Sequence, residues 1–326
     1  MKFGVFLNQY HTEAGVFDES HLVEQAELME EVGYDSVTVG ERHVHDEGFV
    51  EPVTALAAIA ARTDSLQLGT AAMLPALYDP LHLAEQFTTI DRLSDGRAAF
   101  GAALGYRERE LEVFGVEMDE RVGRFIESVG LLRRLFDGER VDHSGDFWYY
   151  DDAFVTPPPK GDVPIWIGGH ADVAIKRAAY RGDAWIASAS STLEDLEYQI
   201  GVYEDAIEEF DMDRSKNEVI LMRDCFVADT TEEARDAIEP YLLNLYEIYA
   251  RYGQTYMDEH DVEVDWSELD EKFVIGSPEE CVEQFREYED LGVDHVLVRV
   301  QFPGQPQEPT MTCLERLGDE VIPAFK

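Results

Sequence analysis

One pattern of residues recurs three times along the chain and limits the folds that it can adopt. A helix-like segment ends at a glycine, an aspartate follows within two positions, and a short apolar run comes next, as in residues 28–39 (LMEEVGYDSVTV), 180–186 (YRGDAWI) and 288–298 (YEDLGVDHVLV). Glycine can end a helix because it adopts the left-handed backbone conformation at no steric cost. Helices that alternate with apolar strands are typical of βα units around a parallel sheet. The pattern therefore predicts an α/β protein.

Eight strands can be placed along the sequence, near residues 2–7, 35–39, 66–74, 97–104, 164–168, 183–187, 218–228 and 294–300. Helices are expected near residues 18–32, 52–62, 80–93, 119–137, 171–181, 192–210, 231–252, 278–291 and 311–324. Eight βα units in one chain predict a (β/α)₈ TIM barrel. A doubly wound open sheet is the alternative. It is disfavoured because the first strand is followed by Asn8, Gln9 and Tyr10 rather than by the fingerprint GxGxxG.

Two segments interrupt the alternation, and we interpret them as insertions in one domain that spans residues 1–326. Residues 138–163, before the fifth strand, contain the run FWYY at 147–150 and three prolines at 157–159, which predict a small hairpin and a rigid loop. Residues 253–272, after the seventh helix, combine many acids with aromatic residues. Long excursions at the carboxyl ends of barrel strands often cover the site. Peripheral or subunit-contact loops are the alternative.

The charge of the chain excludes some partners. Asp and Glu total 69 against 26 Lys and Arg, so the net charge is −43, and the acids are spread over the whole sequence. A surface adapted to high salt accounts for this excess, because salt screens the self-repulsion. An acidic patch for a basic partner is the alternative. Nucleic acid is not an expected partner, because its phosphates would be repelled.

Apolar runs and cysteines bear on the expected location. No apolar run approaches the roughly 18 residues that span a bilayer, and the amino-terminal segment lacks the pattern of a signal peptide. The three cysteines, Cys225, Cys281 and Cys313, are widely spaced and form no CxxC pair. The sequence therefore predicts no disulfide framework, no membrane association and a reducing cytoplasm.

The fifth strand ends in two glycines that open a helix, in residues 164–170 (PIWIGGH). Glycines allow a sharp turn and a close approach of ligand to backbone. The helix that follows begins with unpaired N–H groups and the positive end of its dipole, which favour a phosphate. A plain βα turn that needs glycine only for its geometry is the alternative.

In a barrel, the residues that follow each strand meet in one bowl. The residues expected in this bowl include no obvious pair of nucleophile and base. Ser188 and Ser190 lack the GxSxG motif of serine hydrolases, so serine hydrolase chemistry is not expected. His43 and His45 could present two imidazoles to a metal, with His170 as a third ligand, but no carboxylate follows the sixth or eighth strand. A structural role for His43 is another alternative. The adjacent Glu41 and Arg42 favour a tuned polar site, where His43 exchanges protons.

Several motifs in order along the chain resemble those of the bacterial-luciferase-like oxidoreductase superfamily. They are residues 66–75 (LQLGTAAMLP), 79–86 (DPLHLAEQ), 89–97 (TIDRLSDGR), 105–115 (GYRERELEVFG), 120–125 (ERVGRF) and 164–185. The resemblance covers nearly the whole chain and is weakest at 253–272. It implies a (β/α)₈ barrel, often dimeric, that binds reduced FMN or the deazaflavin coenzyme F420.

The resemblance also implies roles for particular residues. The turn of Gly168, Gly169 and His170 would hold the cofactor phosphate, and Arg124 would assist as a phosphate-binding arginine. The residues expected beside the ring are Thr70, Ala71 and Ala72, which fall at a strand-3 bulge, and Tyr106, which would help to shape the site. Members commonly carry a non-prolyl cis peptide at this bulge, so we expect one near Ala71–Ala72.

The catalytic residues implied are Glu41, Arg42 and His43, which fall on the Glu-His-His stretch of the luciferases. Arg42 replaces the first histidine of that stretch, and Leu104 stands where luciferase-type members carry a phosphate-binding arginine. The fifth-strand pattern and the 110–115 segment look more like members that often use F420.

The resulting hypothesis is a monooxygenase that uses reduced FMN on a small organic substrate. A separate flavin or F420 reductase would supply the reduced cofactor, and the protein would be a homodimer. An F420-dependent hydride-transfer dehydrogenase or reductase is the first alternative. A flavin-binding protein without turnover is the alternative from another class. No metal is expected in any of these.

Overall fold

The strands of the chain close into a parallel barrel, as the alternation of helices and strands predicts. The computed structural model describes residues 1–7, 19–46, 49–252 and 272–326. The barrel strands, in their order around the barrel, are β1 (Lys2–Leu7), β2 (Ser36–Val39), β3 (Gln67–Thr70), β4 (Ala98–Ala102), β7 (Ile165–Gly168), β8 (Ala184–Ala187), β9 (Glu218–Val227) and β11 (His295–Arg299). Pairing of β11 with β1 and of β8 with β9 closes the ring.

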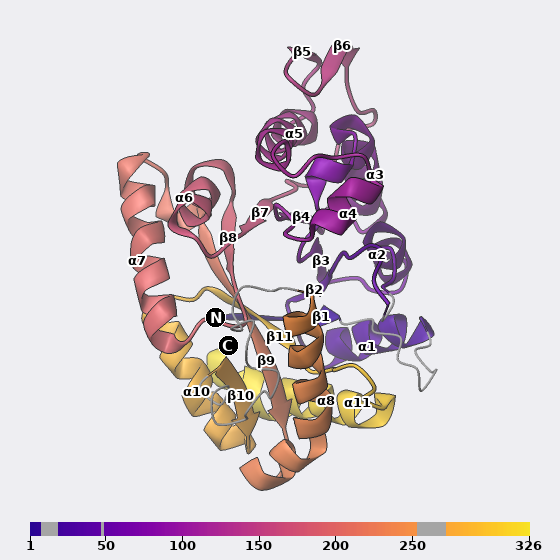
Figure 1. Cartoon of the computed structure of the whole chain (residues 1–326). Coiled ribbons are helices and arrows are strands. Elements are labelled where there is room, and N and C mark those ends of the chain that lie inside the picture. Colours follow the sequence, from indigo (N-terminus) through magenta and orange to yellow (C-terminus); the bar gives the residue numbers. More distant parts are fainter. Residues whose placement is uncertain (8–18, 47–48, 253–271) are drawn as a thin grey trace.

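Helices surround the barrel (Figure 1). They are α1 (Ser20–Glu31), α2 (Pro52–Ala60), α3 (Pro80–Leu93), α4 (Glu108–Val113), α5 (Arg121–Phe136), α6 (Asp172–Arg181), α7 (Leu193–Glu209), α8 (Thr231–Arg251), α10 (Pro278–Leu291) and α11 (Gln307–Arg316). Short 3₁₀- or π-helical segments lie at Pro75–Leu77, Arg214–Lys216, Leu317–Val321 and Ile322–Phe325. Among the described residues, no helix has both the length and the apolar character needed to cross a membrane.

The aspartates of the recurring pattern join neighbouring strands. Asp35, which precedes β2, accepts the N–H of Phe3 in β1 at 2.8 Å and donates its own N–H to the Phe3 carbonyl at 2.7 Å. Two further aspartates repeat this exchange. Asp183 bridges to Ile165 in β7, and Asp294 bridges to Val219 in β9. The aspartate is therefore required because it satisfies a backbone donor at the start of a neighbouring strand.

Glycine is needed in this pattern for two different structural reasons. Gly33 and Gly292 have φ values of +89° and +96°, so they end their helices in the expected left-handed conformation. The prediction is wrong for Gly182, whose φ is −100°. A Cβ there would lie about 3 Å from three backbone carbonyl oxygens, so Gly182 is needed for close packing instead.

A second, smaller cluster of apolar side chains fills the inside of the barrel. It contains Trp166, Ile186, Ile220 and Leu297. Trp166 fits because the facing position, Gly69, has no side chain, and a Cβ there would lie 2.7 Å from the indole ring. The larger core lies between the strands and the surrounding helices. Because bulky side chains fill the inside of the barrel, the site is expected at the carboxyl ends of the strands.

The first predicted insertion is a hairpin, as expected. Strands β5 (Val141–Ser144) and β6 (Tyr149–Ala153) pair antiparallel, and Figure 1 shows them projecting beyond α5. The second insertion, 253–272, lies outside the described residues except for Lys272. The strand that follows it, β10 (Phe273–Gly276), was not expected; it pairs with the carboxyl-terminal half of β9, beyond the part of β9 that joins the barrel. The positions of Asn8 and Gln9, after β1, also lie outside the described part of the chain.

Candidate active site

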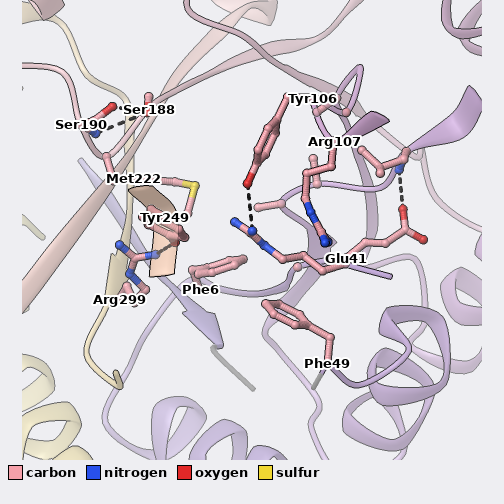
Figure 2. Close-up of a pocket in the computed structure, with 18 of the residues that line it drawn as sticks. Phe6, Glu41, Phe49, Tyr106, Arg107, Ser188, Ser190, Met222, Tyr249 and Arg299 are labelled. Carbon is pink, nitrogen blue, oxygen red and sulfur yellow. Dashed lines mark hydrogen bonds between the residues drawn. The ribbon is translucent and has the colours of Figure 1, made fainter. Parts of the chain in front are cut away.

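A cavity of about 240 Å³ opens at the carboxyl ends of the barrel strands, where the sequence predicts the site. Aromatic side chains form much of its wall: Phe6, Phe49, Tyr106, Tyr246 and Tyr249. Figure 2 labels the rings of Phe6, Phe49, Tyr106 and Tyr249 around the space. Such a wall suits a planar ring, which it can contact face to face while it excludes water.

One side of the cavity is formed where β3 steps toward β4. The peptide bond between Ala71 and Ala72 is cis, which confirms the prediction, and both residues line the cavity. Thr70 holds this step in place, because its hydroxyl donates to the Gly101 carbonyl at 2.8 Å and accepts the Gly101 N–H at 3.0 Å. Thr70 is itself fully buried and is absent from the lining. It therefore positions Ala71, and its predicted place beside a bound ring stays a prediction.

Glu41 lies at the centre of a hydrogen-bond cluster beside the cavity. Its buried carboxylate accepts the Leu74 N–H at 2.5 Å, the Tyr78 hydroxyl, and a bond from His43 Nε2 at 3.0 Å. Glu41 and Arg42 line the cavity, whereas His43 does not. The Glu41 side chain has no exposed surface, whereas that of His43 is 20% exposed, so the carboxylate acts on the site through the groups that it holds.

The surroundings of His43 favour its charged form. Partial burial opposes that form, but the hydrogen bond and the charge of Glu41, with Glu110 and Glu51, outweigh burial and raise the pKa of His43. The ring also packs against Phe114, with centroids 4.5 Å apart. A histidine whose protonated form persists toward neutral pH can hold a proton beside the cavity.

Arg42 brings a positive charge into the aromatic wall. Its guanidinium carbon lies 5.6 Å, 5.9 Å and 5.2 Å from the ring centroids of Phe49, Tyr106 and Tyr249. It also donates to the Tyr106 hydroxyl at 2.9 Å, a bond drawn in Figure 2. Stacked in this way, Arg42 contributes a flat cationic surface rather than the proton-transfer group that a histidine would supply.

Arg107 and Glu110 also belong to the site, although the sequence analysis did not single them out. Arg107 donates to the backbone carbonyls of His43 and Val44 at 2.9 and 3.1 Å, and Glu110 accepts the His43 N–H at 2.5 Å. Both residues line the cavity. They lie at the start of α4, a helix that was not predicted. The available signal was the spacing of an arginine and a glutamate three residues apart directly after Gly105.

The described residues do not bring a metal-binding cluster together. His43 uses its Nε2 on Glu41 and Tyr78. The ring of His45 packs against those of Phe49 and Tyr252, and burial with the charges of Arg42 and Arg107 lowers the pKa of His45 to about 3. The predicted third ligand, His170, lies in the turn before α6 rather than among the lining residues.

A buried ion pair borders the cavity on the side of β9 and β11. Arg299, which lines the cavity, binds both carboxylate oxygens of Asp224, and it also donates to the Tyr249 hydroxyl. Tyr246 donates to Asp224 at 2.9 Å. This network fixes the two tyrosines of the wall, because each hydroxyl is held by a charged partner.

The loop after β8 forms another part of the wall. Ser188 and Ser190 line the cavity, and their hydroxyl oxygens lie 2.8 Å apart. Arg223, which is fully buried in β9, holds the loop by donating to the carbonyls of Ala189 and Ser191 at 2.8 and 2.6 Å. The loop is therefore held by the guanidinium of Arg223, which does not line the cavity.

The predicted phosphate turn does not line this cavity. Trp185 Nε1 donates to the Gly169 carbonyl at 2.7 Å, and a Cβ on Gly169 would lie 2.5 Å from that of Ala174. Packing alone therefore explains Gly169. A Cβ on Gly168 would meet only ordinary contacts, the nearest at 3.7 Å, and its φ is not left-handed. Neither packing nor backbone geometry requires glycine at 168, which leaves close approach of a ligand as a reason for it.

Arg124 lies at the start of α5 and also outside the cavity lining. Its Nε binds Glu120 at 2.9 Å, and its guanidinium lies 5.0 Å and 5.8 Å from the ring centroids of Phe147 and Trp148 in the hairpin. Helices α5 and α6 follow the adjacent strands β4 and β7, so their amino ends lie at the same face of the barrel as the turn at 168–170.

Comparison with known proteins gives a family and several relatives. The family model described as luciferase-like monooxygenase matches residues 1–295. An F420-dependent glucose-6-phosphate dehydrogenase of Amycolatopsis mediterranei is 29% identical, over 97% of this chain and 98% of its own. The oxygenase component of a flavin-dependent trigonelline monooxygenase of Acinetobacter baylyi is 24% identical, over 100% of this chain and 96% of its own.

Among solved structures, the monooxygenase RslO1 of Streptomyces bottropensis superimposes with a TM-score of 0.88 at 24% identity, and each chain is covered completely. At this identity the likeness shows the fold alone. It agrees with the closed barrel described above and confirms the TIM-barrel prediction.

Proposed function

Because this chain belongs to the luciferase-like monooxygenase family, we propose that it is a monooxygenase that uses reduced FMN on a small organic substrate. The observation that carries the proposal is the cavity at the carboxyl ends of the strands, where the cis step at Ala71–Ala72 faces an aromatic wall and the Glu41–His43 pair. When bound, reduced FMN supplies the electrons that activate O₂.

The residues of the chain bind the ring and manage protons around it. Ala71 and Ala72 offer a flat, small surface, so a planar ring can lie close to the backbone there. The rings of Phe6, Phe49 and Tyr106 also line the cavity and exclude water from it. Glu41 raises the pKa of His43 through its hydrogen bond and its charge, so the pair favours a proton on His43 beside the cavity.

The phosphate of the cofactor is proposed to bind at the amino end of α6. The turn of Gly168, Gly169 and His170 opens this helix, and the helix N-terminus favours an anion. Arg124 supports the assignment, because Glu120 holds only its Nε and no described residue is joined to its terminal nitrogens by a hydrogen bond or ion pair.

A second candidate function is hydride transfer with coenzyme F420. The relative from Amycolatopsis mediterranei, which is named as F420-dependent, matches 97% of this chain. Arg42 in the place of a histidine also favours it, since the first histidine of the luciferase stretch is missing. The same cavity suits both candidate functions, because the ring systems of FMN and F420 are similar in size and shape.

Titration of the purified protein separates these functions. Binding of FMN and of F420 is measured by fluorescence, and O₂ consumption is then followed with reduced FMN. The monooxygenase predicts binding of reduced FMN and O₂ uptake that depends on substrate. Tight binding of F420 with no O₂ uptake would select the second candidate. Binding of neither would reject both.

The partners and setting of the protein form part of the same proposal. The relative from Acinetobacter baylyi is named as an oxygenase component, which supports a separate reductase that delivers the reduced cofactor. A homodimer, a cytoplasmic location and a surface adapted to high salt are proposed with it. The three cysteines are free and buried, as expected for a reducing compartment. Light scattering on the purified chain tests the dimer.

A further inference from the structure

The hydroxyl of Tyr249, in the wall of the cavity, has a hydrogen that no described residue accepts. Tyr249 lies on α8 and lines the cavity beside Arg299, and Figure 2 labels both side chains. Arg299 Nη1 donates to the hydroxyl oxygen, so Tyr249 is the acceptor in this bond. Within the described residues, no group accepts a hydrogen bond from Tyr249. A phenolic hydroxyl can donate as well as accept, and its hydrogen is therefore open to a molecule in the cavity.

The other two tyrosines that line the cavity differ from Tyr249. Tyr246 donates its hydrogen to Asp224 at 2.9 Å, so it has none for a ligand. The hydroxyl of Tyr106 also accepts from an arginine, but 39% of the surface of Tyr106 is exposed, so water competes for its hydrogen. Tyr249 is only partly exposed. It is therefore the tyrosine of the wall that is best placed to donate to a bound substrate.

A buried ion pair fixes the Tyr249 hydroxyl in position. The side chains of Arg299 and Asp224 are 2% and 0% exposed. Two nitrogens of Arg299, Nε and Nη2, bind the two carboxylate oxygens, which leaves Nη1 to donate to Tyr249. Because the guanidinium is planar and rigid, its two bonds to Asp224 also set the position of Nη1. The hydroxyl is thus held before a substrate binds, and little reorganisation is needed when it donates.

The charges around Tyr249 strengthen this donor. The guanidinium carbons of Arg42 and Arg299 lie 5.2 Å and 5.4 Å from the centroid of its ring. A hydroxyl that accepts a hydrogen bond from a charged group is polarised, and it becomes a better donor itself. This part of the wall therefore favours an acceptor atom on which negative charge develops during the reaction.

We propose that Tyr249 is a catalytic residue that donates a hydrogen bond to a carbonyl oxygen of the substrate, which is a ketone or an aldehyde. This inference rests on the proposed function and names a substrate class for both candidate reactions. The nucleophile is an oxygen species derived from O₂ in the first and a hydride in the second.

The chemistry of a carbonyl group explains why it suits this donor. When the nucleophile adds, a bond forms at the carbonyl carbon, and the π-electron pair of the C=O bond moves to the oxygen. No proton is transferred in this addition, so the oxygen becomes negatively charged, and the hydrogen bond from Tyr249 stabilises that charge. An ether or an amine could accept the same hydrogen bond but gains no such charge.

The first test compares two probes that differ at one atom position. Acetophenone has a carbonyl group, and α-methylstyrene has the same shape with a CH₂ group in place of the oxygen. Binding is measured by NMR titration, with and without FMN or F420. Tyr249→Phe keeps the ring and loses the hydroxyl. We expect it to weaken binding of acetophenone by about 3- to 10-fold and to change that of α-methylstyrene less than about twofold. Tyr241→Phe, the same change on α8 outside the cavity lining, is the matched control and should alter neither.

Infrared spectroscopy detects the hydrogen bond itself. The carbonyl stretch of acetophenone bound to the parent should lie at a lower frequency than in an apolar solvent, because a hydrogen bond weakens the C=O bond. In Tyr249→Phe it should move back toward the apolar value. The measurement on the parent alone is sufficient if the variant does not fold. Turnover is then followed with a panel of ketones and aldehydes. We expect Tyr249→Phe to lower turnover on the order of 10²-fold, more than it lowers affinity, because the charge develops only during the reaction.

The outcomes separate the two proposals. The role of Tyr249 is overturned if the parent does not bind acetophenone, if the variant loses affinity for both probes equally, or if the carbonyl stretch is the same in parent and variant. Turnover of compounds without a carbonyl group, and of no ketone or aldehyde, would overturn the substrate class. If the parent binds neither FMN nor F420, the proposed function fails, and the two probes and the infrared spectrum still decide whether Tyr249 binds a carbonyl oxygen.

Discussion

At the scale of single residues, the pKa of His43 depends on Glu41. The hydrogen bond and charge of Glu41 raise that pKa, so the pair stabilises the fold below the ordinary histidine pKa of about 6.5, and this contribution is lost as the pH rises through the raised value. We expect Glu41→Gln to lower the pKa of His43 and to reduce turnover on the order of 10²-fold. NMR titration of the His43 ring measures the first effect. Glu108→Gln, an exposed change on α4, is the control. An unchanged titration in Glu41→Gln would contradict the assignment.

Arg124 makes a separate prediction at the same scale. We expect Arg124→Ala to weaken cofactor binding by about 10-fold or more while turnover at saturating cofactor changes less, because the residue lies outside the cavity lining. Arg134→Ala removes a charge from the last turn of the same helix, where Glu139 pairs with it, and should have no effect on binding. Unchanged affinity in Arg124→Ala would reject its phosphate role.

The residues of the site were predictable to different degrees. Glu41, Arg42, Ala71, Ala72 and Tyr106 line the cavity because each lies in the loop that follows a barrel strand, a position that the sequence reveals. Local sequence patterns do not reveal contacts between residues that are far apart in the chain. The sequence therefore could not show that Tyr78 donates to Glu41 or that Arg223 supports the loop after β8.

At the scale of elements, the aspartates that bridge neighbouring strands explain the recurring sequence pattern. Asp294 accepts the N–H of the fully buried Val219 at 2.8 Å and also binds Arg214. We expect Asp294→Ala to lower the free energy of unfolding by about 1–3 kcal/mol, because a buried donor is left unsatisfied. Denaturant unfolding measures this. Asp290→Ala, an exposed change at the end of α10, should alter the free energy by less than about 0.5 kcal/mol. Equal effects of the two changes would refute the bridging role.

Elements with strong periodicity matched their predicted bounds, and those set by tertiary contacts did not. Helix α3 begins and ends at the predicted residues, because Asp79 caps it and Pro80 fixes its first turn. Strand β3 is shorter than predicted, since the chain leaves the strand at the cis bond after Ala71 and makes only a bridge at Met73. Helix α4 and strand β10 are too short for periodicity to reveal.

At the scale of the whole molecule, charge sets the conditions in which the barrel is stable. Even if each of the 26 Lys and Arg residues paired with a different acid, 69 − 26 = 43 carboxylates would have no basic partner. Their mutual repulsion acts over about 10 Å at 0.1 M salt and about 3 Å at 1 M salt. We therefore expect the melting temperature to rise by at least several degrees from low to molar sodium chloride. Chloride is the suitable anion for this measurement, because sulfate strengthens apolar burial in any protein. A melting temperature that is unchanged over this range would show that the acidic surface is not an adaptation to salt.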